Sequence, residues 1–114
     1  MKKIFFINGV LILVLGMSPL LATAEEWYEG GALHSATVDD WNSADASNKL
    51  ATAADWASIR PKVQDKLKKS GDIATLRRFS NKLVKCTNRA TQGKGYGHNP
   101  VLGLAEGCML LMGW

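Results

Sequence analysis

Two cysteines are the residues of this chain with the most definite chemistry. Cys86 and Cys108 are its only thiols. In an oxidising compartment, an even number of cysteines in a short chain usually forms disulfides, and two cysteines allow a single pairing. A redox-active thiol is the alternative, but the sequence has no C-x-x-C motif and no histidine beside either cysteine. The sequence therefore predicts a structural disulfide between Cys86 and Cys108.

The other residues that could take part in chemistry form no catalytic or metal-binding motif. His34 and His98 are the only imidazoles, and neither belongs to an H-x-x-x-H or H-E-x-x-H pattern. Asp39 and Asp40 could imitate paired catalytic carboxylates, but adjacent helix positions diverge by about 100°. Ser35 beside His34 lacks the third member of a hydrolytic triad. We therefore expect no catalytic residue, no metal ligand and no cofactor, and the chain is predicted not to be an enzyme.

A glycine-rich segment, residues 93–97, precedes a predicted helix, and such loops can present backbone N–H groups to an anion. The segment lacks the G-x-x-x-x-G-K-[ST] spacing of a nucleotide-binding P-loop. The favoured interpretation of residues 92–100 is a connector, in which Asn99 caps the following helix and Pro100 takes its first position.

Residues 1–24 are typical of a secretory signal peptide. A positive start at Lys2 and Lys3 precedes an apolar run over 4–15, and residues 22–24 form an A-x-A cleavage motif. The alternative is an uncleaved anchor, against which the Asn, Gly and Pro residues in the stretch argue. We expect cleavage after Ala24, a periplasmic or secreted location, and no membrane span in the mature chain.

Removing 24 of the 114 residues leaves 90, which suits one small domain and is too few for a catalytic barrel or two domains. The composition, with 46% apolar residues and four tryptophans, excludes a disordered tail. Residues 25–114 are therefore predicted to form one domain. Its first segment, residues 25–33, is expected to be an irregular arm that docks through Trp27 and Tyr28.

Apolar residues recur at helical spacing along the first part of the domain. Thr37, three residues before Asp40, predicts an N-cap and a short helix over 38–43. Asp45 predicts a second cap, before an alanine-rich helix that extends to residue 59. Pro61 allows two interpretations, a new helix that starts there and runs to residue 69, or a kink in one longer helix.

The strongest helical pattern covers residues 73–90, which Asp72 is predicted to cap. Its apolar face consists of Ile73, Leu76, Phe79, Leu83, Cys86 and Ala90. A last helix is expected from Val101 to Met112, with Gly103 and Gly107 as points of close helix contact. No segment alternates in the manner of a strand, so no sheet is expected. The prediction is an all-α bundle of three to five helices, with the disulfide joining the last two.

Charge is unevenly distributed along the domain. Residues 25–58 contain seven acids and one lysine, a net charge of −6, whereas residues 59–114 contain eleven basic residues and three acids, a net charge of +8. In the favoured interpretation, the two halves pack on each other or the charges are solvated helix faces. The functional interpretation is a basic surface for a polyanionic partner such as an acidic protein, an anionic lipid or a cell-envelope polymer. This surface would consist of Lys62, Lys66, Lys68, Lys69, Arg77, Arg78, Lys82, Lys85 and Arg89.

These observations favour a non-enzymatic protein-binding module of the bacterial cell envelope, whose partner is another envelope or secreted protein of acidic character. Export and the lack of interleaved aromatic residues disfavour nucleic acid as the partner. Trp41 and Trp56 are expected in the core. The predicted partner-binding residues are Arg77, Arg78, Lys82, Lys85, Arg89, Trp27 and Trp114. The alternative function is an inhibitor or immunity protein against a secreted or cell-wall-degrading enzyme, acting through the acidic half or the 92–100 loop.

Two segments, WYEGGALHSATVDDWNSADASNKLATAADW (27–56) and AEGCMLLMGW (105–114), resemble an uncharacterised family of small exported bacterial proteins. The resemblance covers about half of the mature chain and implies an exported helical domain. It implies no catalytic residue, and the basic segment 60–89 lies outside it.

Overall fold

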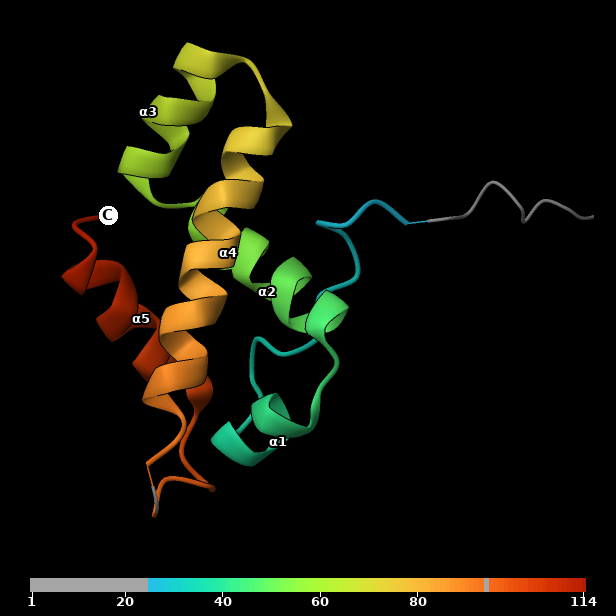
Figure 1. The fold of residues 1–114 in the computed structure, drawn as a ribbon, viewed down its shortest axis with the longest axis vertical. Coiled ribbons are helices and arrows are strands. Elements are labelled where there is room, and N and C mark those ends of the chain that lie inside the picture. The colour runs from blue at the N-terminus through green and yellow to red at the C-terminus, as the bar shows by residue number, and fades with distance from the viewer. Residues whose placement is uncertain (1–24, 94) are drawn as a thin grey trace, which may run out of the picture.

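The computed structural model describes residues 25–93 and 95–114, and over that range the protein is helical (Figure 1). The helices are α1 (Val38–Ser43), α2 (Ala46–Ser58), α3 (Pro61–Ser70), α4 (Ile73–Ala90) and α5 (Val101–Leu111). The predicted all-α fold is confirmed. The predicted signal peptide, residues 1–24, lies outside the described residues.

Helix α4 is the element on which the domain is built, because α2, α3 and α5 all pack against it. Figure 1 shows α3 beside the N-terminal part of α4, and α5 running back along its C-terminal part. The face that α4 buries carries Leu76, Leu83 and Thr87, all nearly inaccessible to solvent. Its central position follows from its length and from an apolar stripe that continues over most of its turns.

The apolar side chains form two clusters. The first contains Trp41, Trp56 and Leu83 together with apolar residues of α5. The indoles of Trp41 and Trp56 stack with 5.8 Å between ring centroids, as expected for two core tryptophans. The second cluster lies between α2, α3 and α4, and both Trp27 and Tyr28 pack against it. The predicted docking of the N-terminal arm is thus confirmed.

Local capping fixes where three of the helices begin. The hydroxyl oxygen of Thr37 accepts from the Asp40 N–H at 3.1 Å, and the Asp40 carboxylate accepts from the Thr37 N–H, which completes a capping box. Asp45 and Asp72 cap α2 and α4 in the predicted way. Hydrogen bonds from the Asn48 N–H and then the Ser47 hydroxyl lower the pKa of the Asp45 carboxyl.

Pro61 begins a new helix, which decides between the two interpretations of that segment. Arg60 is extended and forms the N-cap of α3, with Pro61 at the first helical position. The missing N–H of a proline costs nothing at this position, because the first N–H groups of a helix have no partner within it. Gly71 ends α3 in the left-handed conformation at φ 62°.

The start of α5 differs from the prediction by one residue. Pro100 is the N-cap rather than the first helical residue, and Asn99 makes no capping side-chain bond. Two backbone bonds of an isolated bridge act there instead: the Val38 N–H donates to the Asn99 carbonyl at 2.9 Å, and the Val101 N–H donates to the Ala36 carbonyl at 3.0 Å. The bridge ties the beginning of α5 to the beginning of α1.

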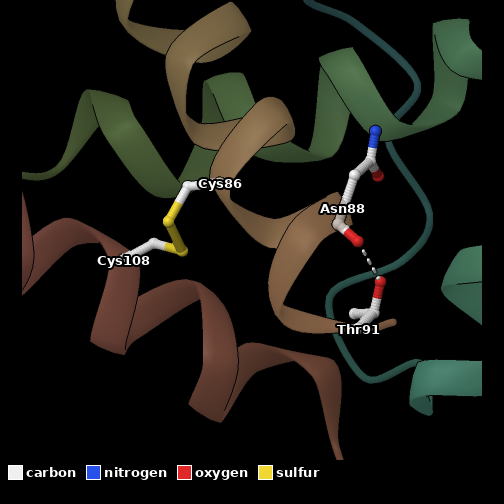
Figure 2. The surroundings of a disulfide bond; sticks show 4 residues. All are labelled: Cys86, Asn88, Thr91 and Cys108. Carbon is white, nitrogen blue, oxygen red and sulfur yellow. Dashed lines mark hydrogen bonds between the residues drawn. A yellow bond between two sulfur atoms is a disulfide. The ribbon is translucent and has the colours of Figure 1, made fainter. Parts of the chain in front are cut away.

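The disulfide between Cys86 and Cys108 joins α4 to α5, as predicted (Figure 2). Its two Cα atoms lie 5.9 Å apart. The end of α4 lies one turn beyond Cys86, where the Thr91 hydroxyl donates to the Asn88 carbonyl at 2.9 Å. The disulfide and the bridge at Pro100 therefore hold α5 at two points.

Two other details of the predicted packing are wrong. Ile73, assigned to the buried face of α4, is 50% exposed, because it occupies the first position of the helix and belongs to neither cluster. A Cβ atom added at Gly103 or Gly107 would meet no atom within 4 Å, so neither glycine permits a close helix contact. The glycine that does so is Gly31, where a Cβ would lie 2.6 Å from the backbone nitrogen of Thr52 on α2.

We expect Gly31→Ala to destabilise the protein by about 1 to 3 kcal/mol, because the arm must move away from α2 to avoid the backbone. Gly107→Ala is the matched control: its surroundings are open, and alanine in a helix interior should stabilise by roughly 0.5 to 1 kcal/mol. Urea unfolding of both variants measures the two changes. If both variants changed the free energy of unfolding by the same amount and in the same direction, the close packing of the arm against α2 at Gly31 would be contradicted.

Candidate functional site

The exposed face of α4 carries a continuous row of cations. Arg78, Lys82, Lys85 and Arg89 follow one another at spacings of four, three and four residues, which places them on one side of the helix. All four are exposed, and at about 1.5 Å per residue the row is roughly 16 Å long. We call these four residues the basic stripe. It brings together four of the seven predicted partner-binding residues.

The basic stripe carries no counter-charge in the part of the chain that the structure describes. Two ion pairs occur there, between His34 and Asp55 at 2.7 Å and between Lys69 and Asp65 at 3.2 Å. The first lies within the acidic half, and the second lies within α3. Neither joins the acidic half to the basic half, so the stripe faces solvent with its charge unpaired.

Arg77 points away from the stripe and contacts the N-terminal arm. Its guanidinium lies 5.2 Å from the ring centroid of Trp27, within the range of a cation–π interaction. Trp27 in turn makes a T-shaped contact with Tyr28, with 5.3 Å between ring centroids. Two more of the predicted residues therefore lie together, and Trp27 is half-buried by contacts within its own chain.

Trp114 packs on another side of α4. Its ring meets Phe79 edge to face, with centroids 5.1 Å apart, and its main-chain oxygen accepts from Nη2 of Arg60 at 3.2 Å. Phe79 and Arg77 are two positions apart on α4 and therefore point in directions that differ by roughly 200°. The two predicted aromatic anchors, Trp27 and Trp114, are thus not part of one continuous surface.

A small pocket opens where α3 meets the N-terminal part of the stripe. It has a volume of about 130 Å³ and is lined by Lys66, Thr75, Arg78, Phe79 and Lys82. Thr75 and Phe79 were not among the predicted partner-binding residues, and Lys66 entered only through the wider basic set. Their meeting depends on how α3 packs against α4, for which the sequence gives no direct signal.

Two further hollows lie elsewhere on the described residues. One, of about 420 Å³, is lined by four carboxylates, Glu25, Glu26, Glu29 and Asp45, together with Trp27 and small polar residues. The other, of about 270 Å³, lies between the 92–100 loop and α5. No group of three or more His, Cys, Asp or Glu side chains within the described range is arranged to hold a metal ion.

Comparison with protein-family models, with curated proteins and with solved structures gave no match. None of the helices at residues 25–93 or 95–114 has both the length and the apolarity needed to cross a membrane. The described residues form a small disulfide-linked helical fold with an exposed row of cations.

Proposed function

We propose that this protein is a non-enzymatic binding module of the cell envelope, and that it docks an acidic partner protein along the basic stripe. One observation carries the proposal: four cations are aligned on the exposed side of α4, and no carboxylate within the described residues pairs with them. Isolated surface charges are common, but an aligned row creates a field that attracts a partner of opposite sign.

The rigidity of α4 supports this use. The helix is fixed by α2 and α3 on its buried side and by the disulfide to α5. Cations on a rigid helix keep the spacing of their backbone positions, so less conformational entropy is lost when a partner binds. The disulfide also supports an extracytoplasmic location, because such bonds persist mainly in oxidising compartments.

An acidic protein fits the stripe better than a single-stranded nucleic acid. Proteins that bind single strands combine positive charge with exposed aromatic rings on which bases stack. The stripe has no such ring among its own residues, and Phe79, which lies beside Arg78 and Lys82, is half-buried against Trp114. Carboxylates on an extended or helical segment of the partner would pair with the cations of the stripe, and this contact needs no aromatic ring.

Poly-L-glutamate tests this proposal with a partner of known chemistry. We expect its dissociation constant for the protein to rise about tenfold between about 0.05 M and about 0.5 M sodium chloride, because salt screens exposed charges. Poly-L-lysine at the same salt concentrations should not bind measurably. Fluorescence anisotropy of the labelled polymers gives both affinities.

Tyr96→Ala is the control for the alternative function, in which the 92–100 loop inhibits an enzyme. Tyr96 is 43% exposed on that loop and lines a hollow to which no stripe residue contributes. The Tyr96→Ala variant should bind poly-L-glutamate as tightly as the wild type does. Affinity that is insensitive to salt would contradict docking on the stripe, and a loss of binding in Tyr96→Ala would favour the loop.

A further inference from the structure

The pocket between α3 and α4 combines charge with an apolar wall. Lys66 approaches from α3, whereas Arg78 and Lys82 come from successive turns of α4, and all three are exposed. The ring of Phe79 forms the apolar part of the lining. Three cations around an aromatic ring suit a group that has both negative charge and carbon atoms.

Arg78 is held at the pocket by a chain of hydrogen bonds. Its Nη2 donates to the Thr75 hydroxyl oxygen at 3.3 Å, and the Thr75 hydroxyl donates to the Ser70 hydroxyl oxygen at 2.8 Å. Thr75 is buried, with 4% of its surface exposed, so it is a fixed support for the guanidinium. The remaining N–H groups of Arg78 are free of protein partners in the described residues. A held guanidinium loses less freedom when it binds a carboxylate.

Phe79 is also held in place by aromatic packing. Trp114 meets it edge to face at 5.1 Å, and both rings pack against the second apolar cluster. The wall of the pocket is therefore part of the core rather than a mobile surface side chain. A ligand that enters would find the aromatic surface already in place.

The size of the pocket limits what can enter it. A volume of about 130 Å³ corresponds to roughly four water molecules at about 30 Å³ each. It is well below the roughly 300 to 1,000 Å³ of sites that enclose a whole small-molecule ligand. A hollow of this size suits one side chain of a larger partner better than a whole cofactor.

From these features we infer that the pocket accepts a glutamate side chain of the acidic partner, with the carboxylate among Arg78, Lys66 and Lys82 and the methylene groups on Phe79. This inference rests on the proposed function and names its anchoring contact. The rest of the basic stripe attracts the partner at longer range, whereas the pocket selects a carboxylate that is carried on a short carbon chain.

Butyrate reproduces the end of a glutamate side chain, and titrating it into the isotopically labelled full-length protein tests the pocket by NMR. We expect the amide signals of Thr75, Arg78, Phe79 and Lys82 to shift, while those of Lys85 and Arg89 stay in place. Butyrate should bind at least about fivefold more tightly than inorganic phosphate, which lacks the carbons, or butyramide, which lacks the charge. N-acetylalanine, which mimics a chain end, should also bind more weakly than butyrate.

Two variants examine the lining. Arg78→Gln should raise the butyrate dissociation constant about fivefold through loss of charge-assisted hydrogen bonds. Phe79→Leu keeps the core filled but removes the flat ring, and should raise it by about threefold. The double variant Lys85→Gln and Arg89→Gln is the matched control, because it removes two charges from the far end of the stripe. It should leave butyrate binding unchanged and weaken only poly-L-glutamate binding.

The control also separates the two proposals. If poly-L-glutamate binds the double variant as tightly as the wild type, the proposed function fails, whatever happens at the pocket. The pocket assignment is overturned by shifts spread evenly over the stripe, by no shift at all, or by phosphate, butyramide or N-acetylalanine binding as tightly as butyrate. Unchanged butyrate affinity in both Arg78→Gln and Phe79→Leu would overturn it as well.

Discussion

Replacing both cysteines with alanine is expected to lower the free energy of unfolding by about 3 kcal/mol. Cys86 and Cys108 are 22 positions apart, and the disulfide closes that loop in the unfolded chain as well as in the folded one. Without it the unfolded chain gains conformational entropy, and small domains have only about 5 to 15 kcal/mol of stability in all. The melting temperature should fall by roughly 12 to 24 °C.

Chemical unfolding of the oxidised and double-alanine proteins measures this difference. Reducing and alkylating the native protein is the control, since it removes the same cross-link without changing other residues. We expect both forms to remain helical by circular dichroism at low temperature, because α2 and α3 still pack on α4. A loss below about 0.5 kcal/mol would show that the loop is already restricted in the unfolded state.

The second large effect is expected at Trp41, the largest fully buried side chain in the described residues. Trp41→Ala should cost about 3 to 5 kcal/mol, because it leaves a cavity beside Trp56 in the main apolar cluster. The indole N–H also donates to the Asn88 side-chain oxygen at 2.8 Å, which ties α1 to α4. Calorimetry or urea unfolding gives the change.

Two further substitutions show where this cost arises. Trp41→Phe keeps an aromatic ring in the core but loses the bond to Asn88, and should cost about 1 to 2 kcal/mol. Trp27→Ala removes a half-buried indole of the arm and should cost less than Trp41→Ala does. A larger loss of stability in Trp27→Ala than in Trp41→Ala would mean that the arm, and not α1, completes the core.

The positions of the helices could be predicted from the sequence because their signals are local. Thr37, Asp45 and Asp72 cap helices that follow immediately, and the periodicity of α4 depends only on its own residues. The disulfide followed from the count of cysteines. Pro61 was ambiguous because a proline satisfies the rules both for a first helical position and for a kink.

What could not be predicted depends on contacts between distant segments. Pro100 is an N-cap because its neighbours bond to Ala36 and Val38, some sixty residues earlier in the chain. The contact of Arg77 with Trp27 similarly needs the position of the arm. Periodicity places Ile73 on the buried face of α4, but it does not show how far along that face the neighbouring helices extend.

The same limit applies to the candidate site. Helical spacing alone places Arg78, Lys82, Lys85 and Arg89 on one face, so the stripe could be predicted from the sequence. The pocket was not, because Lys66 reaches it only through the packing of α3 on α4. Whether the acidic half neutralises the stripe was also open, and the ion pairs of the described residues show no such contact.

We propose that the arrangement of charge on α4, rather than net charge, binds the partner. Two triple variants, each losing three positive charges at exposed positions, test this most directly. The stripe variant combines Lys82→Gln, Lys85→Gln and Arg89→Gln. The α3 variant combines Lys62→Gln, Lys68→Gln and Lys69→Gln. The measurement is the dissociation constant for poly-L-glutamate at low salt. We expect the stripe variant to bind about tenfold more weakly and the α3 variant less than about threefold more weakly. Equal losses in the two variants would contradict the claim.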